Sequence, residues 1–348
     1  MTQMQTTARL FQPLQLGKLT LRNRIVLPPM CQYMASTEEG RVTEYHLAHY
    51  GVRALSGLGL IIVEATGIEP DGRLSGNDLG LWEDEQLPGM RRLAEVISAN
   101  GAVPGIQLNH AGRKAWPGAQ RLVAPSPLPF DSGQRTPHEL TPAEMEGIAA
   151  RFAAAAQRAA AAGFKLIELH GAHGYLLSEF LSPLVNRRED EFGGALENRW
   201  RFPLMVVEAV KQVLPEDVVL GIRLSAEDYA EGGNTTEDCV QISRALEQAG
   251  IQLLHISTGG VVPVKPPAWP GYQLPCAKAV RQAVSIPVIG VGILEQPFLA
   301  DFAIREGYCD LVAIGRGYLR DPHWAVTAAR SLHEEPMLPE SMLAGLLR

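Results

Sequence analysis

The feature that most restricts the fold of this chain is a strand-then-helix pattern repeated along nearly its whole length. Short aliphatic runs predict eight strands, at Arg24–Leu27, Leu60–Ala65, Val103–Leu108, Leu166–His170, Val218–Leu224, Leu253–Ser257, Val288–Gly290 and Leu311–Ile314. Amphipathic stretches predict the helices, at Glu44–Leu55, Gln86–Ala99, Pro142–Ala162, Leu196–Val213, Glu237–Gln248, Pro275–Val284, Pro297–Arg305 and after Arg320. Strands that alternate with helices in this way predict an α/β protein with a parallel sheet.

Eight such units favour closure of the sheet into a (β/α)8 TIM barrel, and 348 residues suit one large barrel domain covering residues 1–348. The rival fold is a doubly wound open sheet, which usually has fewer strands and a glycine-rich first turn. Neither Gly57-Leu58-Gly59 nor Gly315-Arg316-Gly317 continues into a full GxGxxG motif. The barrel is therefore the predicted fold, and residues 325–348 form a C-terminal tail whose role the sequence leaves open.

Charge and cysteine content exclude several classes of function. A net charge of −7 and a pI of about 5.8 argue against a nucleic-acid or anionic-membrane surface. No apolar run is long enough for a membrane span, and the first residues lack a signal-peptide core. The four cysteines are scattered without a CxxC pair, which is poor for a disulfide frame or a metal site. These features predict a cytoplasmic protein without metal, membrane or nucleic-acid partners.

In a barrel of this type, the residues at the carboxyl ends of the strands converge on one site. The predicted strand ends carry prolines, glycines and polar side chains, namely Pro28, Pro29, Met30, Cys31 and Tyr33, Ala65, Gln107, Lys114, His170, His173 and Tyr175, Arg223, Ser257 to Gly260, Val291 and Gly292, and Gly315 and Arg316. The loop that carries Lys114 has roughly 30 residues, more than a barrel needs, which indicates a functional loop.

Several of these residues have both a functional and a structural interpretation. The glycines after strands seven and eight, with Arg316, suit a phosphate, although such glycines also make ordinary tight turns. Arg223 lies in an apolar strand and needs either an anionic or electron-rich ligand or an ion pair with Glu64 or Glu168. The amide of Gln107 suits the edge of a pyrimidine-like ring, or it is a satisfied core glutamine.

The loop after strand four carries His170, His173 and Tyr175. Two histidines spaced HxxH can bind a metal, but no third ligand is well placed in the sequence. As hydrogen-bond donors they would polarise a carbonyl or nitro oxygen, and Tyr175 would then donate a proton to carbon. Cys31 follows a rigid proline pair, and a lone cysteine of this kind is usually an inert small side chain.

The segment HGAHGYLLSEFLSPLVNRREDEFGG, from His170 to Gly194, resembles the signature of the Old Yellow Enzyme family of FMN-dependent ene-reductases. The motifs NRIVLPPMCQY, IIVEATGIEPDGR, IQLNHAGRKA, GIRLSAEDY, LHISTGG and IGRGYLRDP resemble that family in the same order. The resemblance covers the chain from Leu10 to about Trp324. Cys31 with Tyr33, the Lys114 motif and the second histidine resemble the thermophilic-like bacterial subclass.

The resemblance implies non-covalently bound FMN at the barrel mouth. Its contacts would come from strand ends around the ring: Pro28, Pro29, Met30, Cys31, Ala65, Gln107, Arg223, Gly260, Val291, Gly292, Gly315 and Arg316. Within this set, Gln107 would bind the pyrimidine edge, Arg223 would lie near N1 and O2, and Gly292, Gly315 and Arg316 would hold the phosphate. Cys31 would tune the flavin's reduction potential.

The resemblance also implies an NADPH dehydrogenase of ping-pong type, with NADH as a possible reductant, acting on enones, nitro compounds or quinones. His170, His173 and Tyr33 would bind the substrate oxygen, and Tyr175 would protonate the α-carbon. Lys114 and Trp269 would complete the substrate pocket, and a homodimer or homotetramer is the usual assembly. The other hypotheses are a metal-dependent lyase or hydrolase and a flavin-binding redox sensor.

The chain departs from the family pattern at two places. Ala195 replaces the serine that commonly begins the helix after the FGG motif, so the start of that helix loses a side-chain cap. The tail LPESMLAGLLR lacks the aromatic and arginine residues that reach a neighbouring subunit in the subclass, so a subunit-crossing arginine is not expected from that motif.

Overall fold

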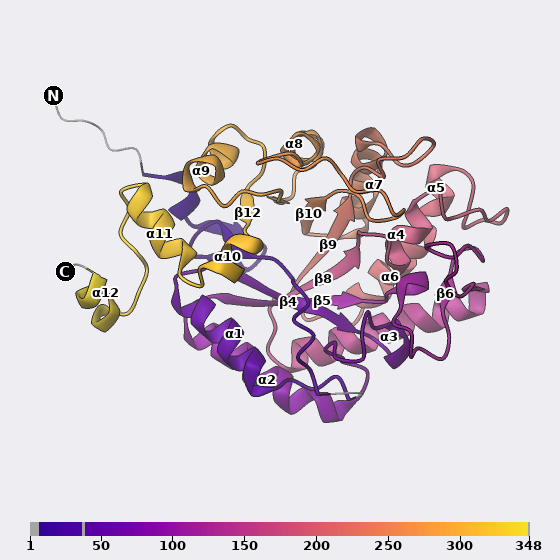
Figure 1. The fold of residues 1–348 in the computed structure, drawn as a ribbon, viewed down its shortest axis with the longest axis horizontal. Helices are drawn as coiled ribbons and strands as arrows, with labels where there is room; N and C mark the ends of the chain where they lie inside the picture. The colour runs from indigo at the N-terminus through magenta and orange to yellow at the C-terminus, as the bar shows by residue number, and fades with distance from the viewer. Residues whose placement is uncertain (1–6, 37–38, 347–348) are drawn as a thin grey trace.

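The computed structural model describes residues 7–36 and 39–346, and its centre is a closed barrel of parallel strands with helices around it (Figure 1). The strands follow one another around the barrel in chain order and close between the first and the last, confirming the predicted (β/α)8 barrel. They are β3 (Ile25–Leu27), β4 (Leu60–Gly67), β5 (Val103–Asn109), β8 (Leu166–Gly171), β9 (Val219–Ser225), β10 (Leu253–Ser257), β11 (Val288–Gly290) and β12 (Leu311–Ala313).

The helices that cover the barrel agree closely with the predicted ranges. They are α1 (Glu44–Leu55), α2 (Leu87–Ala99), α3 (Pro142–Ala161), α5 (Leu196–Arg199), α6 (Arg201–Lys211), α7 (Thr236–Ala249), α8 (Leu274–Ala283), α9 (Pro297–Arg305) and α11 (Trp324–Ser331). The single helix predicted over Leu196–Val213 is wrong in one respect, because the chain forms α5 and α6 with a break at Trp200.

Several short elements have no counterpart among the predicted ones. A hairpin of β1 (Leu14–Leu16) and β2 (Leu19–Leu21) precedes the barrel, and β6 (Val123–Ala124) pairs with β7 (His138–Glu139) in the long loop after β5. Three short helices, α4 (Leu176–Leu181), α10 (Arg316–Arg320) and α12 (Glu340–Leu346), complete the fold.

The helix ends show why the local sequence fixes these boundaries. At the start of α3, the Thr141 hydroxyl accepts from the Glu144 backbone amide, and the Glu144 carboxylate accepts from the Thr141 amide in return. Pro142 occupies the first helical position, where its missing amide hydrogen costs nothing. Helix α5 begins at Ala195 without a side-chain cap, as expected from the missing serine.

The interior of the barrel is apolar at its amino end and polar at its carboxyl end. One buried cluster fills the amino end, and it contains Leu16 and Leu21 of the hairpin together with inward-facing residues such as Leu166, Val219 and Leu253. Because side chains on a strand alternate between faces, residues two and four positions further along β8, β9 and β10 face the same interior. Those positions carry Glu168, His170, Arg223, His255 and Ser257.

The chain after α11 returns toward the amino end of the barrel, away from these polar residues. The Asn23 amide lies 3.5 Å from the Met337 sulfur, and a Cβ added to Gly57 would meet the Met337 carbonyl at 3.1 Å. Asn23 precedes strand β3 and Gly57 precedes strand β4, so both contacts lie at the amino end of the barrel. Among the residues that the structure describes, no helix is long and apolar enough to cross a membrane.

Candidate active site

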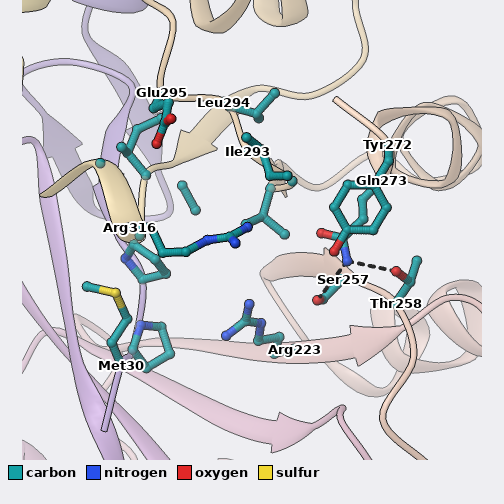
Figure 2. Close-up of a pocket in the computed structure, with 18 of the residues that line it drawn as sticks. Met30, Arg223, Ser257, Thr258, Tyr272, Gln273, Ile293, Leu294, Glu295 and Arg316 are labelled. Atoms are coloured by element: carbon teal, nitrogen blue, oxygen red, sulfur yellow. Dashed lines mark hydrogen bonds between the residues drawn. The ribbon is translucent and has the colours of Figure 1, made fainter. Parts of the chain in front are cut away.

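A cavity of about 270 Å³ opens at the carboxyl ends of the barrel strands (Figure 2). Residues predicted to bind a cofactor line it from several strand ends, namely Pro28, Pro29, Met30, Arg223, Val291, Gly292, Gly315 and Arg316. Sequence reasoning did not assign a role to others in the lining, including Ser257, Thr258, Tyr272, Gln273, Ile293 and Glu295. Their signal in the sequence is only that they follow strands β10 and β11.

Two arginines face this cavity without an acidic partner. Figure 2 shows the side chains of Arg223 and Arg316 directed into the same space. Among the described residues, no carboxylate lies within ion-pair distance of either one, and the buried Arg223 Nε has no hydrogen-bond partner. Glu295 also lines the cavity, but it is ion-paired with Arg320. The cavity therefore carries excess positive charge and suits an anionic or electron-rich ligand.

The two carboxylates proposed as structural partners of Arg223 have other contacts. Glu64 accepts from the backbone amide of Gln32 at 2.6 Å, and Glu168 accepts from the side chains of Gln107 and His255. Burial lowers the pKa of Arg223, with Glu168 acting in the opposite direction through space. No direct ion pair joins Arg223 to Glu64 or Glu168, although Glu168 acts on Arg223 through space, so the guanidinium is available to a ligand.

The loops around the cavity contain several strained backbone positions. Tyr33, His173, Tyr229 and Ile293 all have φ between 54° and 60°, a left-handed conformation that non-glycine residues adopt at an energetic cost. Each follows a barrel strand on the carboxyl side. Such strain persists only where the surrounding structure fixes it, and it gathers at binding sites. Gly292, with φ of 123°, has a conformation that an L side chain rarely adopts.

His170, His173 and Tyr175 come together beside the cavity. The His170 ring packs edge-on against His173 at 5.2 Å and against Tyr175 at 4.8 Å between centroids. Burial, followed by the charge of Arg223, holds the pKa of both histidines well below its usual value. Burial also raises the pKa of Tyr175. The three groups are consequently neutral hydrogen-bond donors across the physiological pH range.

Hydrogen bonds indicate which imidazole nitrogen carries the proton. His170 Nδ1 accepts from the Ala172 amide, which places its proton on Nε2. His173 Nε2 lies 2.8 Å from the Ser257 hydroxyl, and the Gln273 amide donates toward that hydroxyl at 3.4 Å (Figure 2). This donor order favours a Ser257 hydroxyl that donates to His173 Nε2, leaving the proton of His173 on Nδ1.

Lys114 ties together the loops of this site. Its ammonium donates to the carbonyl oxygens of His173 at 2.9 Å and Gly260 at 3.1 Å. It also lies 4.9 Å from the ring centroid of Tyr175 and 4.4 Å from that of Phe130. Burial lowers the pKa of Lys114 to about 8. In this geometry the hydrogen bonds of Lys114 hold the His173 and Gly260 loops together. The sequence predicted a substrate contact for Lys114 and a cofactor contact for Gly260.

Cys31 and Tyr33 lie on the loop after β3. Burial, reinforced by Asp78 and Glu64, raises the pKa of the Cys31 thiol, so the thiol stays protonated and is a poor nucleophile. Tyr33 is 51% exposed. Trp269 is 56% exposed and lies 6.1 Å, between ring centroids, from Tyr272, which lines the cavity.

Two predicted cofactor residues, Ala65 and Gln107, are buried in the strands. The metal-dependent alternative needs further ligands beside the two histidines. In the described part of the chain, no group of three His, Cys, Asp or Glu side chains is placed to hold a metal ion.

A (β/α)8 barrel whose mouth joins a cationic cavity to neutral imidazole and phenol donors is the arrangement of an enzyme that binds an anionic group beside its substrate. A family model described as NADH:flavin oxidoreductase / NADH oxidase matches residues 9–335, and the chain belongs to that family. This finding confirms the Old Yellow Enzyme resemblance. The chain is thus an oxidoreductase that uses a flavin and a nicotinamide cofactor.

Individual relatives agree with this assignment. The chain is 45% identical over 323 residues to the NADPH dehydrogenase of Geobacillus sp. (strain WCH70), covering 93% of this chain and 94% of the relative. Morphinone reductase in complex with tetrahydroNAD matches with a TM-score of 0.79 and 31% identity, over 96% of this chain and 93% of that one. 2-Naphthoyl-CoA reductase matches with a TM-score of 0.87 and 26% identity over 94% of this chain, which spans only about half (52%) of that protein.

Proposed function

We propose that this protein is an FMN-dependent ene-reductase, which takes reducing equivalents from NADPH and reduces activated C=C bonds of α,β-unsaturated carbonyl or nitro compounds. The observation that carries the proposal is the placement of the neutral donors His170, His173 and Tyr175 beside a cavity that holds two unpaired arginines. A nitrogen or phenol donor suits a carbonyl or nitro oxygen, and the arginines suit an anionic cofactor.

The residues lining the cavity fit FMN as the flavin that this protein binds. FMN combines a ring system that gains negative charge on reduction with a phosphate, and the cavity offers one unpaired guanidinium for each: Arg223 on β9 and Arg316 at the start of α10. At Gly315, an added Cβ would approach the Met30 sulfur to 3.3 Å, so a side chain there would crowd the loop after β3. We infer that Arg316, Gly292 and Gly315 hold the phosphate, while Pro28, Pro29, Met30 and Val291 contact the ring or ribityl chain without a covalent bond.

When bound, the flavin would supply a hydride, which carries the two reducing electrons, after NADPH has reduced it in a preceding half-reaction. The protein's own residues orient the alkene and manage the proton. His170 presents its Nε2 hydrogen, and His173 its Nδ1 hydrogen, to the substrate oxygen, so negative charge that develops there is stabilised. Tyr175 gives its phenolic proton to the α-carbon and regains one from solvent.

The remaining predicted roles also belong to this proposal. Tyr33 adds a hydrogen-bond donor to the substrate oxygen, and Cys31 and Ala65 contact the flavin. Trp269 forms part of the pocket wall, where its ring contacts that of Tyr272. Lys114 shapes the pocket by holding the His173 loop, which is a positioning role. NADPH is proposed as the reductant because the relative from Geobacillus is named an NADPH dehydrogenase. We expect a cytoplasmic homodimer or homotetramer.

The test begins with purified protein, which should be yellow and should be bleached by NADPH without added metal. A panel of cyclic enones, nitroalkenes and quinones is then offered to the reduced enzyme in stopped flow. Tyr175→Phe should slow the reduction of weakly activated alkenes by roughly 10²- to 10⁴-fold, the usual contribution of a general acid, while NADPH oxidation continues at its normal rate. Full rates in both half-reactions would refute the role of Tyr175. A reduced enzyme that reacts with oxygen but with none of the panel would refute the proposed function.

A further inference from the structure

Beneath the cavity, four polar side chains from adjacent strands meet inside the barrel. Gln107 of β5, Glu168 of β8, Arg223 of β9 and His255 of β10 are all between 0% and 8% exposed. The strand register places Gln107 opposite Glu168, and Arg223 opposite His255. A layer of this kind normally holds branched apolar residues in a barrel, so four polar groups here require an explanation.

Glu168 is the centre of this layer. Its Oε1 accepts from the Gln107 amide at 2.8 Å, and its Oε2 lies 2.8 Å from His255 Nδ1. Burial and Arg223 lower the pKa of His255, so the neutral ring donates its Nδ1 hydrogen to the carboxylate. Both oxygens of Glu168 therefore have donors that are themselves uncharged. Arg223 supplies a full positive charge that interacts with Glu168 through space.

These contacts have two consequences for the cavity above. First, one amide hydrogen of Gln107 is fixed on Glu168, so the amide cannot flip, and its oxygen and second hydrogen keep a single orientation. Second, the negative charge of Glu168 opposes the positive charge of Arg223 without touching it, because no direct hydrogen bond joins the two groups. The arginine thus stays free to face a ligand while the buried layer remains close to neutral.

We propose that Glu168 is a positioning residue that orients Gln107 and balances the charge of Arg223, and that it thereby sets the reduction potential and the affinity of the bound flavin. This inference rests on the proposed function only in requiring FMN at the cavity. Reduction adds negative charge to a flavin, so a nearby carboxylate opposes reduction and a nearby guanidinium favours it. The balance between Glu168 and Arg223 then decides the potential.

The decisive experiment measures the flavin midpoint potential, by dye equilibration, in purified holoenzyme variants. Glu168→Gln removes the charge but keeps an oxygen that can accept from Gln107 or His255. We expect its potential to rise by at least about 30 mV, which corresponds to a tenfold change in the equilibrium constant of a two-electron couple. Glu168→Asp keeps the charge and withdraws it by one methylene, so its potential should stay near the wild-type value while FMN binds several-fold more weakly.

Arg223→Gln should lower the potential, and the double variant Glu168→Gln/Arg223→Gln should lie between the two single variants. The double variant buries no charge at either position. If Glu168→Gln does not fold, the difference in potential between Arg223→Gln and the double variant measures the effect of the Glu168 charge instead. Glu179→Gln serves as the control for the side-chain change itself, since Glu179 is another fully buried glutamate, is protonated below its raised pKa of about 8, and contacts the Gly112–Arg113 turn instead of the polar layer. Its potential should not change.

A potential that is the same in wild type and Glu168→Gln, or the same in Arg223→Gln and the double variant, would overturn the proposal and reduce Glu168 to a packing role. These readouts do not depend on turnover. A wild-type enzyme that binds FMN but reduces no alkene would contradict the proposed function and leave this test valid. Protein that binds no flavin at all would contradict both.

Discussion

Replacing Glu179 by glutamine should stabilise the folded protein by an amount that grows with pH. Glu179 on α4 is fully buried; its Oε1 accepts from the Arg113 backbone amide, and its Oε2 has no hydrogen-bond partner. Burial raises the pKa of this carboxyl group from 4.5 to about 8, although Arg113 and Lys114 act in the opposite direction. The folded state therefore holds a proton that the unfolded state releases at much lower pH.

The sign and size of the effect follow from that difference. The contribution of Glu179 to stability is fully present below pH 4.5 and is lost as pH rises toward 8. Since one pKa unit corresponds to about 1.4 kcal/mol, the loss between pH 5 and pH 9 is on the order of 4 kcal/mol. Glutamine has the shape of the protonated carboxyl group but does not titrate. The free energy of unfolding of Glu179→Gln, minus that of wild type, should thus increase by about 4 kcal/mol over this range.

The assay is urea denaturation of both proteins at several pH values from 5 to 9, with the linear extrapolation made at each. Glu179 raises the pKa of Lys114 in the wild type, so the difference between the two proteins reports the coupled pair of Glu179 and Lys114. Glu208→Gln is the control, because hydrogen bonds from Lys211 and Gln212 lower the pKa of this exposed carboxyl group, and its difference from wild type should stay constant above pH 5. A constant difference for Glu179→Gln as well would refute the argument.

Three further substitutions test the site. Ser257→Ala removes the partner of His173 Nε2, and we expect a loss of about 1 kcal/mol, or roughly fivefold weaker binding of an enone substrate to the holoenzyme in an absorbance titration. Lys114→Met leaves the carbonyls of His173 and Gly260 without their donor, and amide exchange in both loops should become faster, roughly tenfold for each 1.4 kcal/mol lost. Trp269→Ala should change the range of substrates reduced while altering the free energy of unfolding by less than about 0.5 kcal/mol, since the side chain is mostly exposed; an unchanged range would remove Trp269 from the pocket wall.

The barrel was predictable because its strands are short apolar runs, buried on both faces, separated by amphipathic helices. Strands β10 and β11 and helices α1 and α9 have the predicted bounds, and the other ends differ by only a few residues. The hairpin β1–β2 and helix α4 escaped prediction because each is too short for a period of 2 or 3.6 to emerge. The break at Trp200 did have a sequence signal, because Pro203 has no amide hydrogen to donate to the Arg199 carbonyl, but the amphipathic pattern on both sides outweighed it.

The site was predictable as a set of strand ends but not as a network of contacts. His170, Arg223 and Gly292 could be placed at the barrel mouth because the fold alone brings strand ends together. The bonds of Glu168 to Gln107 and His255 depend on register between strands far apart in the chain, which no local pattern contains. The sequence singled out Gln107 and Glu168 separately but not their contact, and the only signal for His255 was that it lies two residues before the strand end Ser257, on the same face.

Burial of the proton donors has a consequence for how this site responds to pH. A histidine in water is half-protonated near pH 6.5, but His170 and His173 are kept neutral by desolvation and by Arg223, and Tyr175 is kept neutral by desolvation. A protonated imidazole at His170 or His173 would place a second positive charge near the cavity. An anionic ligand would then be attracted to that imidazole as well as to Arg223. The groups with pKa values near 8, Lys114 and Glu179, instead control the loops that hold these donors. The proton donors His170, His173 and Tyr175 therefore keep their protonation state near pH 8, because burial holds them neutral. Lys114 and Glu179, which contact the surrounding loops, change theirs in that range.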